Sequence, residues 1–172
     1  SGEHAAARAS GMPMPAVDDA QLRRDAADID AIIGRDRTGR RVSEIKEELD
    51  NEMNRNVAVF RDEAGLRHAH EVVRRLKEEA RTAYIDDRGT VFNQDVLGAL
   101  ELGFMLDCAE ATVVASIERK ESRGAQFRTD FPDRNDDEWL KHIDIGRNGD
   151  DVPEVSYSPV TITQWQPEER KY

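Results

Sequence analysis

The sequence predicts a mainly α-helical protein: an up-down-up three-helix bundle, like a spectrin repeat, preceded by a short helix and followed by an irregular segment with a β-hairpin. Three observations support this fold class. Apolar residues recur every three or four positions in long stretches, polar or glycine-containing breaks separate these stretches, and the helical period stops after Arg123 and Gly124. A chain of 172 residues is long enough to bury such a core.

We expect three parts along the chain. Residues 1–16 form an N-terminal remnant and linker, 17–123 the helical bundle, and 124–172 a C-terminal irregular and hairpin docking segment. Residues 10–16 carry two prolines among small residues, which is typical of a linker. A start at Ser1, without a methionine, is expected for a fragment of a longer protein or for a cloning remnant.

The short first helix is expected to begin near Asp18 or Asp19. The following break, at 34–41, contains two glycines and four arginines, and we expect a solvated loop there that can touch an acidic neighbour. The apolar residues of the helix follow a helical spacing and are Leu22, Ala26, Ile29 and Ile33.

The first two bundle helices are expected to begin at N-cap residues. Ser43 can cap the first, with Glu44 in its first turn, and Asp62 can cap the second. Apolar positions on both helices recur at spacings of three and four, which is typical of packed antiparallel helices. They are Ile45, Leu49, Met53, Val57 and Phe60 on the first, and Leu66, Ala69, Val73, Leu76, Ala80 and Ala83 on the second.

The third bundle helix is the longest. A turn at 86–89 precedes Asn93, which can cap a helix running to about Glu121, roughly 40 Å at 1.5 Å per residue. Cys108 lies in this helix without a cationic neighbour, and we expect it to be a buried, inert thiol. The apolar residues spread over more than one face, which predicts burial on several sides; they are Val96, Leu97, Leu100, Phe104, Met105, Leu106, Val113, Val114 and Ile117.

The chain after Gly124 is expected to be irregular and then extended. The pair Asn148-Gly149 favours a hairpin turn between strands. The tail carries Trp165 and Tyr172 among charged residues, and we expect it to lie as a strap on another protein surface. The returning extended segment is indicated by Val152, Val155, Tyr157, Val160 and Ile162.

Composition and motifs exclude several classes of function. A net charge of −11 argues against nucleic acid, because binding to phosphates depends on clustered Lys and Arg. No apolar run reaches the length of about 18 residues that a membrane span needs. A single cysteine excludes an internal disulfide. The chain has no P-loop and no G-x-G-x-x-G dinucleotide-binding loop.

No metal site is predicted. His68 and His70 are two positions apart on a helix and point to different faces, so they do not chelate one ion. The acidic run at 133–138 lacks the glycine and the terminal glutamate of a calcium loop. We expect this run to be a solvated turn or the start of a helix.

The charged residues around the end of the long helix have two interpretations. One is a helix C-cap with surface ion pairs; the other is an interface in which guanidinium groups contact carboxylates or carbonyls and order the following turn. The aromatic area of Phe127, Phe131 and Trp139 favours the interface. We expect Gly124 to take the left-handed position that closes the helix. The predicted interface or turn-ordering residues are Arg119, Glu121, Ser122, Arg123, Gly124, Arg128, Asp130, Trp139 and His142.

This stretch resembles a signature in the C-terminal region of succinate dehydrogenase and fumarate reductase flavoprotein subunits, R-x-E-S-R-G-A-H-x-R-x-D followed by a proline, acidic residues and W-x-x-H. Gln126 stands where the family usually has histidine. The likeness extends from Val42 onward and includes 93–102 and the ending at 170–172. The matching positions are Arg119, Glu121, Ser122, Arg123, Gly124, Ala125, Arg128, Asp130, Pro132, Asp136, Trp139, Lys141 and His142.

The resemblance implies a helical bundle that packs on a flavin domain, close to an iron-sulfur subunit. It implies a parent enzyme with FAD that interconverts succinate and fumarate and exchanges electrons with quinone. It also implies a place on the cytoplasmic face of the membrane, held there only indirectly through anchor subunits, although the isolated chain would be soluble. The family's flavin-linking, substrate-binding and proton-shuttling residues belong to motifs that this chain lacks. We therefore assign no catalytic, cofactor-binding or metal-ligating residue here, and expect no cofactor in this chain.

Two other interpretations stay open. L-aspartate oxidase, a soluble flavin enzyme, ends in a similar architecture with an E-S-R-G-type motif, although the W-L-K-H stretch and the tail favour the dehydrogenase. A free-standing helical interaction module is the other, and it would need a self-sufficient core. The helix from Asn93 to Glu121 is too apolar for a lone three-helix bundle.

Overall fold

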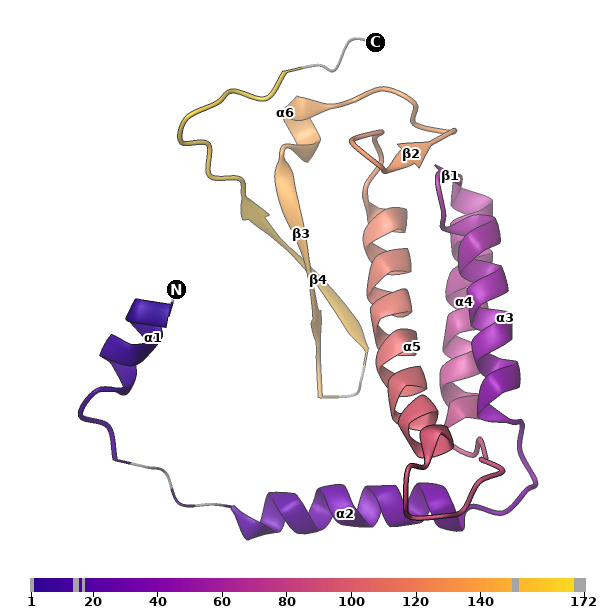
Figure 1. Cartoon of the computed structure of the whole chain (residues 1–172). Coiled ribbons are helices and arrows are strands. Elements are labelled where there is room, and N and C mark those ends of the chain that lie inside the picture. The colour runs from indigo at the N-terminus through magenta and orange to yellow at the C-terminus, as the bar shows by residue number, and fades with distance from the viewer. Residues whose placement is uncertain (1, 14–15, 17, 150–151, 169–172) are drawn as a thin grey trace.

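The computed structural model describes residues 2–13, 16, 18–149 and 152–168. Helices α3, α4 and α5 form a bundle, and a hairpin of β3 and β4 lies beside α5 (Figure 1). This arrangement confirms the mainly helical fold with a C-terminal hairpin. In chain order the elements are α1 (Gly2–Ala9), α2 (Asp19–Gly34), α3 (Val42–Asn56), β1 (Phe60–Arg61), α4 (Glu63–Ala80), α5 (Gln94–Glu118), β2 (Phe127–Arg128), α6 (Asp136–Trp139), β3 (Lys141–Arg147) and β4 (Pro153–Pro159).

The core of the bundle lies between the apolar faces of its three helices. Burial of such side chains is the main force that holds the helices together. The central cluster of buried residues consists of Ile45, Leu49, Val73, Leu76, Ala83, Leu102, Leu106 and Ala109. A second cluster consists of Val57, Leu66, Ala69 and Val113, and a third, which attaches the end of α2, consists of Ile32, Ile85 and Val96.

Two N-caps predicted from the sequence, Asp62 and Asn93, are confirmed, and the helix start expected near Asp18 is confirmed as well. The side chain of Asp18 accepts a hydrogen bond from the backbone N–H of Ala20 at the start of α2. Asp62 and Asn93 do the same at the starts of α4 and α5, where their side-chain oxygens lie 2.8 and 2.9 Å from backbone nitrogens. Each cap satisfies a backbone N–H that the helix itself leaves unpaired.

The predicted cap of α3 is wrong. The N-cap is Arg41 and not Ser43. Arg41 forms a parallel bridge with Tyr84, and the N–H of Val42 donates to the carbonyl oxygen of Tyr84 at 3.2 Å. This pairing holds the chain extended up to Arg41, so that the helix can begin at the next residue.

The predicted position of Phe60 on the apolar face of α3 is also wrong. The helix ends at Asn56. Phe60 lies in β1, which pairs in parallel with β2 so that Phe60 lies opposite Phe127. Its side chain is 71% exposed, because the short parallel pair lies at the end of the bundle and outside its core.

Helix α5 is buried on two sides and open on a third. It contacts α3 and α4 on one side and β3 and β4 on another. On its remaining face, Leu97 is 48% and Phe104 69% exposed. Cys108 is exposed as well, so the prediction of a buried thiol is wrong. A face that is apolar in sequence is therefore left uncovered in this chain.

Helices α1 and α2 extend away from the bundle (Figure 1). None of the residues of the predicted apolar stripe of α2 is buried. The buried residue of this helix is Ile32, which the stripe did not include, and Ile33 is partly buried against the same cluster. Leu22 is 64% and Ile29 37% exposed. Helix α1 has no buried residue. Ser1, the linker residues 14–15 and residue 17 lie outside the described residues.

The C-terminal part contains the predicted hairpin. Strands β3 and β4 are antiparallel, and Ile143 lies opposite Tyr157 and Ile145 opposite Val155. The acidic run is the start of a helix, since Asn135 caps the four-residue helix α6. In the tail, Trp165 is 80% exposed. Tyr172, part of the predicted strap, and the ending at 170–172 lie outside the described residues.

Candidate interface site at the end of α5

Arg119 ties the end of α5 to the hairpin. It is the C-cap residue of α5, which ends three residues earlier than the predicted Glu121. Its Nη1 donates to the carbonyl oxygen of Trp139 at 3.0 Å, and Nη2 donates to that of Lys141 at 2.8 Å. The guanidinium also lies 5.7 Å from the centre of the Trp139 ring, and Trp139 is only 8% exposed. Arg119 therefore positions α6 and the first residue of β3.

Glu121 is a fully buried carboxylate, with 0% exposure. Its Oε1 accepts hydrogen bonds from Arg119 Nη1 and Arg123 Nε, both at 2.7 Å. Its Oε2 accepts one from the backbone N–H of Asn135 at 2.8 Å. Burial by itself would raise the pKa of Glu121, but the hydrogen bonds from Arg123, Asn135 and Arg119 outweigh burial and lower the pKa. The residue is held as a carboxylate at the centre of the turn.

Arg123 extends this cluster to α6. Its Nη2 donates to Glu121 at 3.0 Å and to Asp136 at 2.5 Å. Hydrogen bonds from Arg134 and Arg123 lower the pKa of Asp136 to about 2. The start of α6 is thus held beside Arg123 by a charged pair.

Gly124 has a role different from the predicted one. It has a positive φ of 61°, as expected for a left-handed residue. The residue does not close α5, which has already ended. Instead it lies in a tight turn in which Arg123 and Gln126 exchange backbone hydrogen bonds of 2.8 and 3.0 Å.

Ser122 closes the loop that follows. Its Oγ accepts a hydrogen bond from the N–H of Arg128 at 2.9 Å and donates to the carbonyl oxygen of Phe131, also at 2.9 Å. Its own N–H donates to the carbonyl oxygen of Asp133 at 3.1 Å. These bonds fold residues 122–133 back on themselves beside the end of α5.

Arg128 is completely buried and connects three segments. Its Nη1 donates to the carbonyl oxygen of Ser116 at 2.8 Å, in the last turns of α5. Its Nε and Nη2 donate to the two oxygens of Asp130, both at 2.8 Å. Nη2 also donates to Glu63 at 2.9 Å, in the first turn of α4. Asp130 in turn accepts the N–H of Glu63, and the hydrogen bonds from Arg128 lower the pKa of Asp130 to about 2.

Gln126 occupies the position where the family signature has histidine. Its Nε2 donates to the carbonyl oxygen of Ser116 at 3.3 Å, and its Oε1 accepts a hydrogen bond from Arg61 Nη1. The side chain thereby joins β1 to the end of α5. A neutral amide that both donates and accepts suits this place between a cation and a carbonyl oxygen.

His142 is the predicted residue that the network does not include. Its exposed side chain borders an open pocket of about 510 Å³, which Arg119, Arg123 and Gln126 also line. Its backbone pairs with Ser158 in the hairpin. The structure brings the other predicted residues together, either in the two ionic clusters or in the turn between them.

The sequence interpretation missed Glu63, Arg61 and Asn135. Glu63 is the first residue of α4 and Arg61 lies in β1, and each is 65 positions before a partner, Arg128 and Gln126 respectively. The charged motif at Arg119–Arg128 is defined by residues close together in the sequence, and it does not indicate contacts with residues this far away. Asn135 could have been found, because a polar residue three positions before Glu138 is an N-cap pattern.

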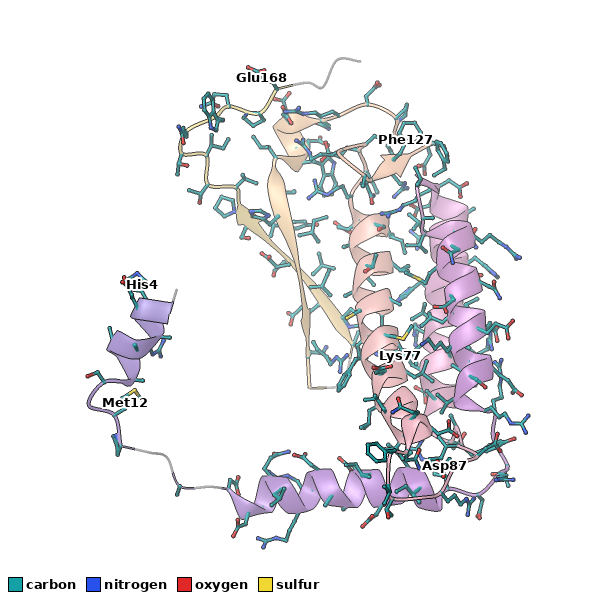
Figure 2. The ribbon with its side chains drawn as sticks, viewed as in Figure 1. His4, Met12, Lys77, Asp87, Phe127 and Glu168 are labelled. Atoms are coloured by element: carbon teal, nitrogen blue, oxygen red, sulfur yellow. The ribbon has the colours of Figure 1, made fainter. Side chains whose placement is uncertain are left out.

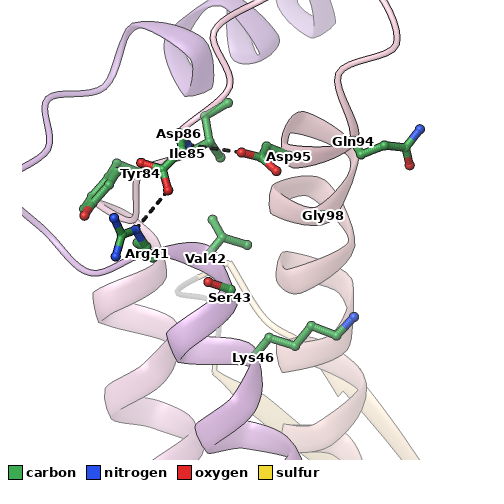
Figure 3. Close-up of a pocket in the computed structure, with 10 residues that line it drawn as sticks. All are labelled: Arg41, Val42, Ser43, Lys46, Tyr84, Ile85, Asp86, Gln94, Asp95 and Gly98. Carbon is green, nitrogen blue, oxygen red and sulfur yellow. Dashed lines mark hydrogen bonds and ion pairs between the residues drawn. The ribbon is translucent and has the colours of Figure 1, made fainter.

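A separate pocket of about 220 Å³ lies at the other end of the bundle, where α3 and α5 begin (Figure 3). Arg41 pairs with Asp86 at 2.9 Å, and Asp95 accepts the N–H groups of Asp86 and Asp87. The pocket is smaller than the roughly 300 to 1,000 Å³ of typical cofactor sites. With no glycine-rich loop in the sequence, these residues do not fit FAD.

The described residues contain no group of three or more His, Cys, Asp or Glu side chains placed to hold a metal ion. Within the same residues, no helix is both long enough and apolar enough to cross a membrane.

Comparisons with known proteins agree with the signature around Arg119–Arg128. Residues 46–172 match the family model described as fumarate reductase flavoprotein C-term. The chain is 40% identical over 154 residues to the fumarate reductase flavoprotein subunit of Mycobacterium tuberculosis strain H37Rv, covering 89% of this chain and 26% of that protein. It is 34% identical over 122 residues to the succinate dehydrogenase flavoprotein subunit of Rickettsia bellii, covering 71% of this chain and 20% of that protein.

Solved structures show the same fold. A variant of the E. coli quinol fumarate reductase FrdA matches with a TM-score of 0.88 at 28% identity, covering 98% of this chain and 29% of that one. The Mycobacterium smegmatis Sdh1 complex matches in fold, with a TM-score of 0.83 at 24% identity and coverage of 96% and 28%. The chain thus spans about a quarter of the length of the curated relatives, 26% in the M. tuberculosis protein. It belongs to the family of C-terminal domains of the fumarate reductase and succinate dehydrogenase flavoprotein subunits.

Proposed function

We propose that this chain is a non-catalytic docking domain that braces the flavin-binding domain of its subunit. The observation that carries this proposal is the uncovered apolar face of α5 and α2. Phe104, Leu97 and Leu22 are 69%, 48% and 64% exposed, although they continue apolar stripes of long helices. Large apolar side chains left exposed on helices in this way indicate protein contacts. Family membership supports this role over a free-standing module.

The parent reaction that we propose is the oxidation of succinate to fumarate. The parent subunit would carry FAD and pass electrons through an iron-sulfur subunit to quinone. Fumarate reduction is the second candidate, because relatives named fumarate reductase flavoprotein subunit reach 40 and 41% identity. The ordinary location of such a subunit would be the cytoplasmic face of the membrane, held there by anchor subunits.

The proposed division of labour follows the three parts of the chain. Residues 1–16 would connect to the flavin-binding part, 17–123 form the brace, and 124–172 dock. The clusters around Glu121 and Arg128 would keep the turn between α5 and the hairpin in one conformation. These residues touch no substrate in this proposal, and the flavin would be held by residues outside this chain.

The first test is the absence of flavin chemistry in the purified chain. We expect it to be colourless, without flavin absorbance at about 450 nm, and inactive with succinate and an artificial electron acceptor. A yellow preparation that holds stoichiometric FAD after gel filtration would contradict the proposal.

The second test concerns the uncovered face. The isolated chain should enhance the fluorescence of a hydrophobic dye and self-associate as its concentration rises. Replacing Leu97 and Phe104 together by serine should lower the dye signal by about half without unfolding α5, because both side chains are exposed. Replacing the exposed Thr112 by serine is the matched control on the same helix. A monomer that binds no dye at any concentration would argue against a docking face.

A further inference from the structure

The end of the bundle where β1 and β2 pair carries a second exposed apolar group. Val59 is 59%, Phe60 71% and Phe127 37% exposed. The rings of Phe60 and Phe127 lie edge to face, with centres 5.6 Å apart. Figure 2 shows Phe127 at this end, far from α2 and from the region of Asp87 at the opposite end. We name Val59, Phe60, Arg61 and Phe127 the β1–β2 surface.

Arg61 in this surface has only neutral partners among the described residues. Its Nε donates to the carbonyl oxygen of Ala58 at 2.8 Å, and its Nη1 donates to Ser116 Oγ at 2.9 Å and to Gln126. These contacts fix the guanidinium in a half-buried position, and burial lowers the pKa of Arg61. The other terminal nitrogen, Nη2, has no acceptor in the described part of the chain and is not among its fully buried unpaired atoms. It therefore remains open to an incoming acceptor.

The two carboxylates that follow Arg61 in the chain, and Asp130 just after β2, are already engaged. Asp62 caps α4. Glu63 pairs with Arg67 and Arg128, and Asp130 pairs with Arg128 at 2.8 Å. A half-buried cation is costly unless it is paired with an opposite charge. Although the chain carries a net charge of −11, no carboxylate among the described residues bonds to this arginine, whose hydrogen bonds all go to neutral acceptors.

We propose that the β1–β2 surface docks a separate subunit, through a segment of it that presents a carboxylate beside a large aliphatic or aromatic side chain. The carboxylate would receive Nη2 of Arg61, and the apolar side chain would pack on Phe60 and Phe127. Aromatic residues and arginine are the side chains most enriched at the centres of protein interfaces. We take the occupant to be distinct from the flavin-binding part, because the contact assigned to that part includes α2, and α2 and the β1–β2 pair lie at opposite ends of the bundle (Figure 1). The inference rests on the proposed docking role and adds a second partner to it.

The test places a photoreactive side chain in the surface itself. Phe60 is replaced by p-benzoylphenylalanine in the intact complex that contains this chain, the sample is irradiated, and the linked peptide is identified by mass spectrometry. We expect a peptide of another subunit with Asp or Glu within about two residues of a large apolar residue, since such neighbours can reach both parts of the surface. Adding Arg61→Gln should lower the yield of this adduct about tenfold, as expected when one partner of a desolvated charge pair is lost.

Controls separate the charge from the fold. Arg81→Gln removes an exposed arginine whose ion pair among the described residues is with Glu78 of α4, and should leave the yield unchanged. Arg61→Lys keeps the charge without the planar fork and should give an intermediate yield. The melting temperature of each variant shows whether a lost adduct reflects unfolding. If Arg61→Gln is unfolded, the yield of Arg61→Lys and the identity of the linked peptide test the inference.

Several outcomes would overturn the inference. They are an adduct to the flavin-binding part, to a second copy of this chain or to lipid, the absence of any adduct in an assembled complex, and a yield insensitive to Arg61. None of these outcomes touches the proposed bracing role, which is tested by the dye and by the uncovered face of α5.

Discussion

Replacement of Arg128 by methionine should lower the free energy of unfolding by about 3 to 5 kcal/mol, the range found when one partner of a buried ionic group is removed. Arg128 is 0% exposed and binds Asp130, Glu63 and the carbonyl oxygens of Ser116 and Ile117. Methionine fills a similar volume but leaves these oxygens without their donor. Urea unfolding followed by circular dichroism measures the change.

Arg67 provides the matched control, because it pairs with the same Glu63. Its side chain is 66% exposed, whereas that of Arg128 is 0% exposed. Arg67→Met should therefore change the unfolding free energy by less than about 1 kcal/mol. Equal losses in the two variants would show that burial of Arg128 contributes nothing beyond a surface ion pair.

Replacement of Glu121 by glutamine should cost about 3 kcal/mol, by the same reasoning about buried charge. The amide keeps the size of the side chain, but it places one NH2 group where Arg119 or Arg123 now donates. Glu121 is 0% exposed, and the side chains of the two arginines are only 17% and 26% exposed, so water compensates little. The loss should appear in urea unfolding together with weaker protection of the N–H of Asn135 in hydrogen exchange.

Glu138→Gln is the control for this substitution. Glu138 lies in the same segment and is exposed, and its carboxylate accepts, within the part of the chain that the structure describes, a single hydrogen bond, from the side chain of Asn135 at 3.2 Å. We expect a change within about 0.5 kcal/mol. If Glu121→Gln were as mild as this control, the turn would be held by its backbone hydrogen bonds and not by the carboxylate.

The parts of the fold that sequence could predict are those decided by neighbouring residues. Asp62 and Asn93 cap helices because their side chains reach an N–H three positions later. The buried face of α4 could be predicted because Leu66, Val73 and Leu76 recur at helical spacing. Such features need no knowledge of the rest of the chain.

The parts that could not be predicted depend on distant contacts. Phe60 fits the periodicity of α3, but pairing with β2 removes it from the helix. Cys108 follows an apolar pattern, and its exposure depends on which faces of α5 other elements cover. In the candidate site, the sequence predicts the cluster of charged residues at 119–130. It does not predict that Glu63 belongs to the cluster, because 65 positions separate Glu63 from Arg128.

The same separation has a consequence for the order of folding. Helices α4 and α5 follow each other in the chain and can pack early, whereas Arg128 must wait until both are in place before it reaches Glu63. Interactions that form after the rate-limiting step act mainly on the rate of unfolding. Arg128 would then slow the unfolding of the packed helices more than it speeds their folding. Slower opening would also protect their backbone from proteases that cleave the transiently opened chain.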